Sequence, residues 1–339
     1  MKAKKFMTVI LSIVITALLF TGCFSSESDS ESSSNKKIVV GVFDMPSLYL
    51  MQTFDDMGYY EKNGANVEFR YFAVYSDAIS AFNTGNVDMI CFAASEAVAP
   101  VVKGIDCKII GVMDTSYGLD GIAADNNIES VADLKGKNVA TEIGTVDHMM
   151  LLRALQKNGL TEADVNLINM SAGDAAAAMN GDSLDAVSTW EPQLSAAAEG
   201  GHIIYSTKDD PDLIADIFLI RTDVLNDRYD NAKAILKTWY QGIEDYLDDS
   251  SKFSATAAEK GELKVDEFSD LMGVTKLVTL DENKEKFTEG TNDMKYLNVL
   301  LRYAGDFLYE NQLIESELSD EMIEGMLDSR IINDIISEK

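Results

Sequence analysis

Two segments of the chain, far apart in the sequence, share one pattern. Residues 83–90 are Asn-Thr-Gly-Asn-Val-Asp-Met-Ile, and residues 181–187 are Gly-Asp-Ser-Leu-Asp-Ala-Val. In each segment an Asp (Asp88 or Asp185) begins a short apolar run, which leads into a helix-like stretch and then to a glycine at the same spacing. A construction that is used twice predicts two similar halves.

The alignment of these segments places residues 93–95 (Ala-Ala-Ser) on residues 190–192 (Trp-Glu-Pro). Each half therefore has a turn of small, polar or aromatic residues where a strand ends. Ligands of open α/β sheets bind at the carboxyl edge of the strands. Two such halves that face each other predict a cleft, as found in a binding protein or in a two-domain enzyme.

Apolar and β-branched runs predict ten strands, at residues 36–43, 67–72, 87–92, 107–113, 122–124, 139–142, 165–170, 184–188, 203–206 and 216–221. Helical patterns lie between them, beginning at Ser47 and covering residues 75–82, 95–103, 145–158 and 173–179. The alternation predicts an α/β fold with two doubly wound, mostly parallel or mixed sheets. From Asn231 onward, apolar residues recur at helical spacing, so we expect these later helices to pack on the first sheet.

The strand at 216–221 is well placed to return from the second half to the first. We therefore predict that residues 38–120 and 216–339 form lobe I and that residues 121–215 form lobe II. The two crossings, near residues 120 and 216, would then act as hinges that let the lobes close on a ligand.

The N-terminus predicts export. Three lysines precede an apolar run at residues 6–20 that is too short for a stable membrane span. The run ends in Leu-Phe-Thr-Gly-Cys, which resembles a bacterial lipoprotein cleavage box, so residues 1–22 are predicted to be a signal peptide and Cys23 to carry the lipid. An ordinary signal peptide with an incidental cysteine is the alternative. Residues 23–37 are rich in serine and predict a flexible tether.

Composition narrows the partners and the chemistry. The chain has 28 basic and 57 acidic residues, a net charge of −29, which makes nucleic acid an unsuitable partner. Its two histidines are far apart and cannot supply the usual metal ligands. Apart from Cys23, the cysteines are Cys91 and Cys107; they are expected to be buried thiols, with a disulfide as the alternative outside the cell.

Four predicted helix starts face the proposed cleft, at Ser47, Ser95, Thr145 and Glu191. Free backbone N–H groups at a helix start favour an anion. The hydroxyl groups at these positions have a second interpretation, because Ser and Thr often cap their own helices. Ala94, which precedes Ser95, belongs to the same turn.

Acidic residues gather at the same predicted turns, whereas no Arg or Lys lies in any of these motifs. They are Asp44, Glu96, Asp120, Glu142, Asp147, Glu191 and Asp216. Such a set would serve a protonated amine well and a purely anionic ligand poorly. Asp120, Glu191 and Asp216 are favoured as ligand contacts, and the others have the alternative of a solvated surface.

Aromatic residues near the same turns would hold a cation or stack on a ring. For Tyr75 and Tyr117 the alternative to this role is packing at the edge of a lobe. His148 is expected to be a partly exposed surface residue, and His202 a residue at a strand end.

Several motifs, weak singly but specific in their order and spacing, resemble the solute-binding proteins of ABC importers, in the branch that binds nitrate, sulfonates, taurine and thiamine-pyrimidine precursors. The resemblance covers residues 38–308. It is carried by Gly85-Asn86-Val87-Asp88, Ala132-Asp133-Leu134-Lys135-Gly136-Lys137, Gly144-Thr145 with Asp147-His148, and Leu184-Asp185-Ala186 through Trp190-Glu191-Pro192.

The resemblance implies a two-lobed clamp of the periplasmic-binding-protein type, a monomer that captures a small solute without any cofactor and hands it to a permease driven by an ATPase. It also implies that Trp190 contacts the ligand. A taurine-like zwitterion or sulfonate is the first expectation, and an aminopyrimidine precursor of thiamine is the second. Outside transport, the alternatives are a pyrimidine-synthase-like enzyme, for which the chain lacks a cysteine-rich run, and a sensor lipoprotein.

Overall fold

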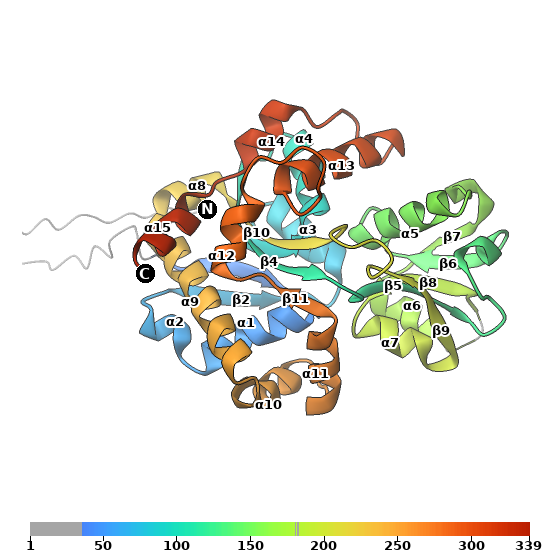
Figure 1. The fold of residues 1–339 in the computed structure, drawn as a ribbon, viewed down its shortest axis with the longest axis horizontal. Coiled ribbons are helices and arrows are strands. Elements are labelled where there is room, and N and C mark those ends of the chain that lie inside the picture. Colours follow the sequence, from blue (N-terminus) through green and yellow to red (C-terminus); the bar gives the residue numbers. More distant parts are fainter. Residues whose placement is uncertain (1–35, 180, 182) are drawn as a thin grey trace, which may run out of the picture. The chain divides into compact units, whose positions relative to one another are not determined.

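The strands of the chain form two mixed sheets, seen in a computed structural model that describes residues 36–179, 181 and 183–339 (Figure 1). The predicted signal peptide, Cys23 and nearly all of the tether lie outside the described residues. The first sheet has the order β11-β4-β10-β3-β1-β2. In that order its strands are Thr275–Leu277, Cys107–Ser116, Ala215–Arg221, Met89–Ala93, Ile38–Val42 and Val67–Tyr71.

The predicted return strand, β10, lies between β3 and β4 and runs antiparallel to both. Strand β1 is parallel to β2 and to β3, whereas β11 is antiparallel to β4. The sheet is therefore mixed rather than mostly parallel. Because β4 leads out of this sheet and β10 leads back into it, the two strands run in opposite directions.

The second sheet repeats this arrangement with the order β7-β6-β8-β5-β9. Its strands, in the same order, are Asn166–Asn169, Asn138–Thr141, Ala186–Trp190, Asp120–Asp125 and Gly201–Ser206. Strand β6 is parallel to β7 and β8, and β5 is antiparallel to β8 and β9. The order β2-β1-β3-β10-β4 thus corresponds strand for strand to β7-β6-β8-β5-β9, and the predicted α/β fold with two mixed sheets is confirmed.

The repeated Asp holds the same position in both halves. The Asp88 N–H donates to the Val39 carbonyl oxygen at 2.8 Å, and its carboxylate accepts from the Val39 N–H at 2.9 Å. The Asp185 N–H donates to the Asn138 carbonyl oxygen at 2.9 Å, and its carboxylate accepts from the Asn138 N–H at 2.8 Å. Each Asp therefore joins the loop before one strand to its parallel neighbour, which explains why the sequence pattern occurs twice.

We expect Asp88→Ala to lower the free energy of unfolding by about 2 kcal/mol, because it removes a charged acceptor from a half-buried N–H and from Arg228, which lies 2.9 Å from the carboxylate. Asp185→Ala should cost less, since the Asn138 N–H that it leaves is exposed to water. Urea denaturation of the two variants measures the difference. Equal losses would contradict this account of the repeat.

Helices cover both faces of each sheet (Figure 1). Around the first sheet lie α1 Pro46–Asp56, α2 Tyr59–Lys62, α3 Tyr75–Asn83, η2 Ala94–Ala97, α4 Val98–Val102, α8 Thr222–Asp227, α9 Tyr229–Asp248, α10 Ser251–Lys260, α11 Val265–Gly273, α12 Leu280–Lys286, α13 Leu297–Glu310, α14 Asp320–Met326 and α15 Arg330–Ser337. Around the second lie η3 Val131–Leu134, α5 Val146–Lys157, η4 Glu162–Asp164, α6 Ala172–Met179, α7 Gln193–Ala197 and η5 Ala198–Gly200.

The late helices differ in what they cover. Helix α9 packs on the first sheet as predicted, where the buried Trp239 ring lies 5.9 Å from the Phe218 ring of β10. Helix α13, which was expected on the same sheet, packs against η2 and α4 instead. The apolar stripe of α13 would look the same whether it packs on a sheet or on other helices. The sequence pattern therefore indicates a buried helix face but not the element that covers it.

The hydrophobic core is continuous from the first sheet to one face of the second. The other face of the second sheet, under α6 and α7, has a smaller and alanine-rich cluster of its own. Within the continuous core, Phe43, Tyr75 and Trp190, which belong to different halves, pack against one another.

The two crossings between the sheets are tied together by side-chain hydroxyl groups. The Ser116 and Thr207 hydroxyl oxygens are 2.6 Å apart, and Thr207 Oγ1 also accepts from the Gly118 N–H at 2.7 Å. The Thr207 N–H donates to the Asp120 carbonyl oxygen at 3.0 Å. The lobe boundaries and the hinge motion remain predictions.

No helix within residues 36–179, 181 and 183–339 is long and apolar enough to cross a membrane.

Candidate functional site

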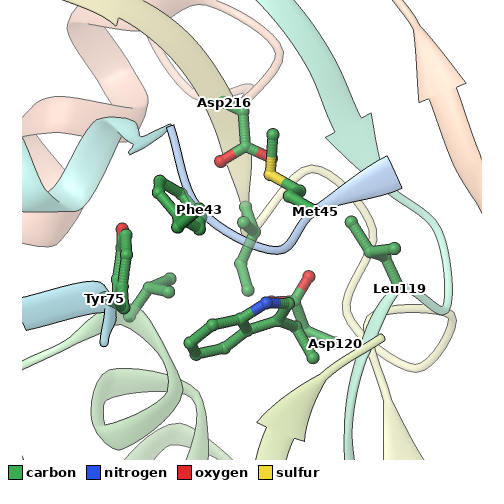
Figure 2. A pocket seen from close by; sticks show the side chains of 9 residues that line it. Phe43, Met45, Tyr75, Leu119, Asp120 and Asp216 are labelled. Atoms are coloured by element: carbon green, nitrogen blue, oxygen red, sulfur yellow. The ribbon is translucent and has the colours of Figure 1, made fainter. Parts of the chain in front are cut away.

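A small cavity lies between the two sheets at the carboxyl edge of their parallel strands, and we call it the inner chamber. Its volume is about 20 Å³, which is room for about one water molecule. Figure 2 shows Asp216 and Asp120 on opposite sides of it, with Phe43 and Tyr75 to one side and Met45 and Leu119 to the other. Val146, Trp190 and Ile214 complete its lining.

A second and larger cavity, the outer chamber, shares Phe43, Tyr75 and Trp190 with the first. Its volume is about 290 Å³. The rest of its lining is polar or small, and consists of Asp44, Ala73, Val74, Glu142, Ser171, Ala172, Gly173, Asp174 and Gln193. The start of α6 is among these residues. The two chambers therefore lie on either side of one aromatic wall.

The aromatic wall connects the two halves of the chain. The ring centroids of Phe43 and Tyr75 are 4.6 Å apart, and Trp190 lies 5.2 Å from Tyr75 and 6.4 Å from Phe43. The Trp190 indole Nε1 donates to the Asp44 carbonyl oxygen at 2.9 Å. These contacts join the two halves beside the cavities, and the faces of such rings are suited to a cation or a flat ring.

We expect Trp190→Ala to weaken solute binding about tenfold, because it removes both the ring and the hydrogen bond to Asp44. Trp190→Phe is the matched control, which keeps a ring and loses only the N–H donor. Its affinity should lie between those of the wild type and of Trp190→Ala by isothermal titration calorimetry. An unchanged affinity in Trp190→Ala would exclude the wall from the site.

Two glutamates reach across the cleft in opposite directions. Glu96, from η2 beside the first sheet, accepts a hydrogen bond from the Val146 N–H at the start of α5, at 2.5 Å. Glu142, which follows β6 of the second sheet, accepts from the Ser76 N–H at the start of α3, at 2.9 Å. Each half therefore caps a helix of the other.

Buried carboxyl groups crowd this region. Burial is the first cause of a raised pKa at Glu96, to about 8, and at Asp120, to about 7. It also raises the pKa of Asp114 to about 6, and those of Asp147 and Asp216 well above the ordinary value of an Asp. Neighbouring carboxylates add to the effect at Asp216 and Asp147, because like charges disfavour ionisation.

Many of these oxygens have no hydrogen-bond partner. Both carboxyl oxygens of Asp147 are buried and unpaired, as are Oδ2 of Asp120 and Oε2 of Glu142. Among the described residues that line the two chambers there is no Lys, Arg or His. A ligand that brings positive charge and N–H donors would satisfy these groups, whereas an anion would meet repulsion in the inner chamber.

The structure brings together six of the residues predicted for the site. Tyr75, Asp120, Trp190 and Asp216 line the inner chamber, and Asp44 and Glu142 line the outer one together with Tyr75 and Trp190. The sequence repeat aligned residues 190–192 with residues 93–95, the turn that follows β3. This alignment correctly placed Trp190, and with it the aromatic wall, at the edge of the sheets.

The other six predicted residues line neither chamber. Glu191, which the sequence favoured as an amine ligand, accepts from both the N–H and the hydroxyl group of Ser195, so its two oxygens are already used. Tyr117 is half exposed, and its N–H pairs with Val274. Ala94 and Ser95 are buried in η2 and directly precede Glu96 in the sequence.

The proposed capping roles of two hydroxyl groups are wrong. Helix α1 has Met45 at its N-cap position, and the buried Ser47 lies beside Asp114, whose pKa it lowers. Thr145 precedes α5 but makes no side-chain cap, because its hydroxyl group donates to the Glu142 carbonyl oxygen at 2.7 Å. The N–H group at the start of α5 is taken by Glu96 instead.

The histidines and cysteines lie away from the chambers. His148 was expected at the surface but is buried, with Nδ1 accepting from the Gly144 N–H and Nε2 3.5 Å from Glu162. His202 lies near the start of β9, as predicted. Cys91 and Cys107 are buried free thiols, the first of the two alternatives.

Sequence reasoning missed much of the lining. Phe43, Met45, Val146 and Ile214 are apolar residues next to strand ends and carry no distinctive pattern. Asp114, the strand neighbour of Asp216, lines neither chamber but was also missed, because β4 continues three residues past the predicted strand end. The acidic residues at the predicted turns, including Glu96 and Asp147, were noticed, but their burial was not foreseen.

Comparisons with known proteins agree with this architecture. The chain is 25% identical to a putative aliphatic sulfonates-binding protein of Bacillus subtilis, over 96% of each chain. It is 20% identical to the taurine-binding periplasmic protein of Escherichia coli, over 57% of this chain and 61% of that protein.

Solved structures show the same fold. The periplasmic aliphatic sulphonate binding protein SsuA of Escherichia coli superposes with a TM-score of 0.70 at 20% identity, covering 87% of this chain and 93% of that one. The desulfurization enzyme DSZB superposes with a TM-score of 0.64 at 14% identity, over 90% and 99%. Residues 52–252, more than half of the chain, match the family model described as NMT1/THI5 like, and the chain therefore belongs to the NMT1/THI5-like family.

Proposed function

We propose that this protein is the extracytoplasmic solute-binding subunit of an ABC importer. It captures a small solute that carries a protonated amine, holds it between the two sheets and delivers it to a permease. The observation that supports this most is the inner chamber, where Asp120 and Asp216 face each other beside three aromatic rings. A hydrogen bond to a charged group contributes about 1.5–3 kcal/mol, so two carboxylates suffice for useful affinity.

The protein would act as a monomer, anchored by lipid at Cys23 to the outer face of the cytoplasmic membrane, on a Gram-positive surface. Lobe I (38–120 and 216–339) and lobe II (121–215) would close around the ligand, and the permease and its ATPase would respond to the closed form. The 20 Å³ inner chamber fits a closed cleft, which must open to admit a solute.

Taurine is the first ligand to test. The relatives named for sulfonates and taurine support a sulfonate, and the acids of the inner chamber favour one that also carries an amine. An aminopyrimidine is the second ligand, because its ring would stack on Trp190 and its amino group would reach Asp120.

Titration calorimetry at pH 7.5 with taurine, ethanesulfonate, ethylamine and a hydroxymethyl-aminopyrimidine tests the ligand class. We expect taurine or the aminopyrimidine to bind, and ethanesulfonate, which lacks the amine, to bind at least tenfold more weakly than taurine. Tighter binding of ethanesulfonate than of every amine would contradict the proposal.

Uptake of the bound solute by intact cells, with and without the gene, tests transport. Loss of uptake that is restored by the wild-type gene supports an importer subunit. Undiminished uptake in the deletion strain, with a purified protein that still binds the solute, would favour a sensor lipoprotein.

A further inference from the structure

We propose that Glu96 and Glu142 determine specificity by occupying, with their own carboxyl groups, two helix starts that would otherwise accept an anion. This inference rests on the proposed function and deepens it. The cleft would bind the cationic part of a solute because carboxyl groups of the protein already occupy the starts of α5 and α3.

The first step is the geometry at α5. This helix has twelve residues, from Val146 to Lys157, and its first N–H groups have no partner within the helix. Glu96 Oε1 lies 2.5 Å from the Val146 N. Glu96 is only 7% exposed and comes from η2, on the opposite side of the cleft. A sulfonate or phosphate at this helix start would need the volume and the hydrogen bond that Glu96 uses.

The second step is the reciprocal contact at α3, a helix of nine residues. Glu142, also 7% exposed, accepts from the Ser76 N–H through Oε1. Glu142 belongs to the second half of the chain and α3 to the first. The exchange is therefore mutual, and it bonds the two halves to each other without any anionic ligand.

The third step concerns the charge around these contacts. Glu142 Oε2 is buried in the wall of the outer chamber with no hydrogen-bond partner. Asp147, in the first turn of α5, is 1% exposed and has two unpaired oxygens. An anion that displaced Glu96 would approach both of these groups, whereas an ammonium group would give them the donor that they lack.

Burial raises the pKa of Glu96 to about 8, and no positive charge is among the causes of its shift. The Tyr75 hydroxyl group and the Val146 N–H both lower that pKa, and Glu142 raises it. A ligand cation at the aromatic wall would stabilise the ionised form of Glu96.

The test is a gain of function. Glu96→Ala opens the start of α5, and Glu96→Gln is the matched control, because its amide oxygen can still accept from the Val146 N–H. Sulfate and ethanesulfonate are the probes, titrated by calorimetry at pH 7.5 into folded protein. We expect Glu96→Ala to bind at least one of these anions tenfold or more tightly than the wild type does, and Glu96→Gln to match the wild type.

Folded Glu96→Ala with no gain for either anion would overturn the inference. Glu142→Ala, which opens α3 by the same logic, provides a second variant should Glu96→Ala fail to fold, and its lack of any gain would count equally against the idea. The amine titration of the wild type reports on the proposed function separately. If the wild type binds amines but the variants gain no anion binding, only the inference is contradicted. If the variants gain anion binding but the wild type binds no amine, only the proposed ligand class is contradicted.

Discussion

Asp216→Asn is expected to weaken the binding of an amine-bearing solute about thirtyfold or more. Asp216 is buried beside β3 at the start of β10 and faces Asp120 across the inner chamber (Figure 2). Removing one partner of a buried, hydrogen-bonded charge pair costs about 2–5 kcal/mol, and 1.4 kcal/mol is a factor of ten in affinity. Isothermal titration calorimetry of both proteins with the tightest-binding amine measures the loss.

The matched control is Asp125→Asn. Asp120 and Asp125 are the two ends of β5, but only Asp120 lines the inner chamber. Asp125→Asn should leave the affinity within about twofold of the wild type. A similar loss in both variants would show that the protein responds to net charge, and no loss in Asp216→Asn would remove the inner chamber from the ligand site.

The second large effect is a pair of opposite trends with pH. The stability of the ligand-free protein should fall between about pH 4 and pH 8, while its affinity for an amine should rise. The pKa values are raised by burial at Asp114 to about 6, at Asp120 to about 7 and at Glu96 to about 8. The folded state therefore holds protons that the unfolded state releases in this range, so stability is lost as pH increases.

Each pKa unit corresponds to about 1.4 kcal/mol, so a total loss of a few kcal/mol and a drop in Tm of about 5 °C or more are expected. Thermal unfolding at pH 5 and pH 8 measures this trend. Glu96→Gln, which cannot ionise, should reduce the drop. An amine ligand should reduce it as well, because it stabilises the ionised carboxylates. A Tm that rises from pH 5 to pH 8 without ligand would contradict the account.

The architecture could be predicted well because it depends on short-range patterns. The apolar runs located ten of the eleven strands in the described residues to within a few residues, and only β11, in the part expected to be helical, was missed. The repeated Asp88 and Asp185 predicted two equivalent halves. The insertion of β10 between β3 and β4 could not be predicted in the same way, because it is a pairing between residues more than a hundred positions apart. The partner of α13 was missed for a similar reason.

The site could be predicted in part. Strand ends identify the edge where Asp120, Trp190 and Asp216 lie, since the sheet topology brings them there. Strand ends do not reveal which polar groups are already hydrogen-bonded within the protein. Glu191 and Glu96 are both acids at predicted turns, yet Glu191 bonds to Ser195 in its own half while Glu96 crosses to α5. That difference arises from the contact between the two halves, which no local pattern contains.

The most direct test is a crystal structure of the protein with the amine that binds most tightly in calorimetry. We predict the amine nitrogen within hydrogen-bond distance of Asp120 and Asp216, against the rings of Tyr75 and Trp190, with Glu96 still on the Val146 N–H. A ligand whose anionic group occupies the inner chamber, or one bound outside both chambers, would contradict the account.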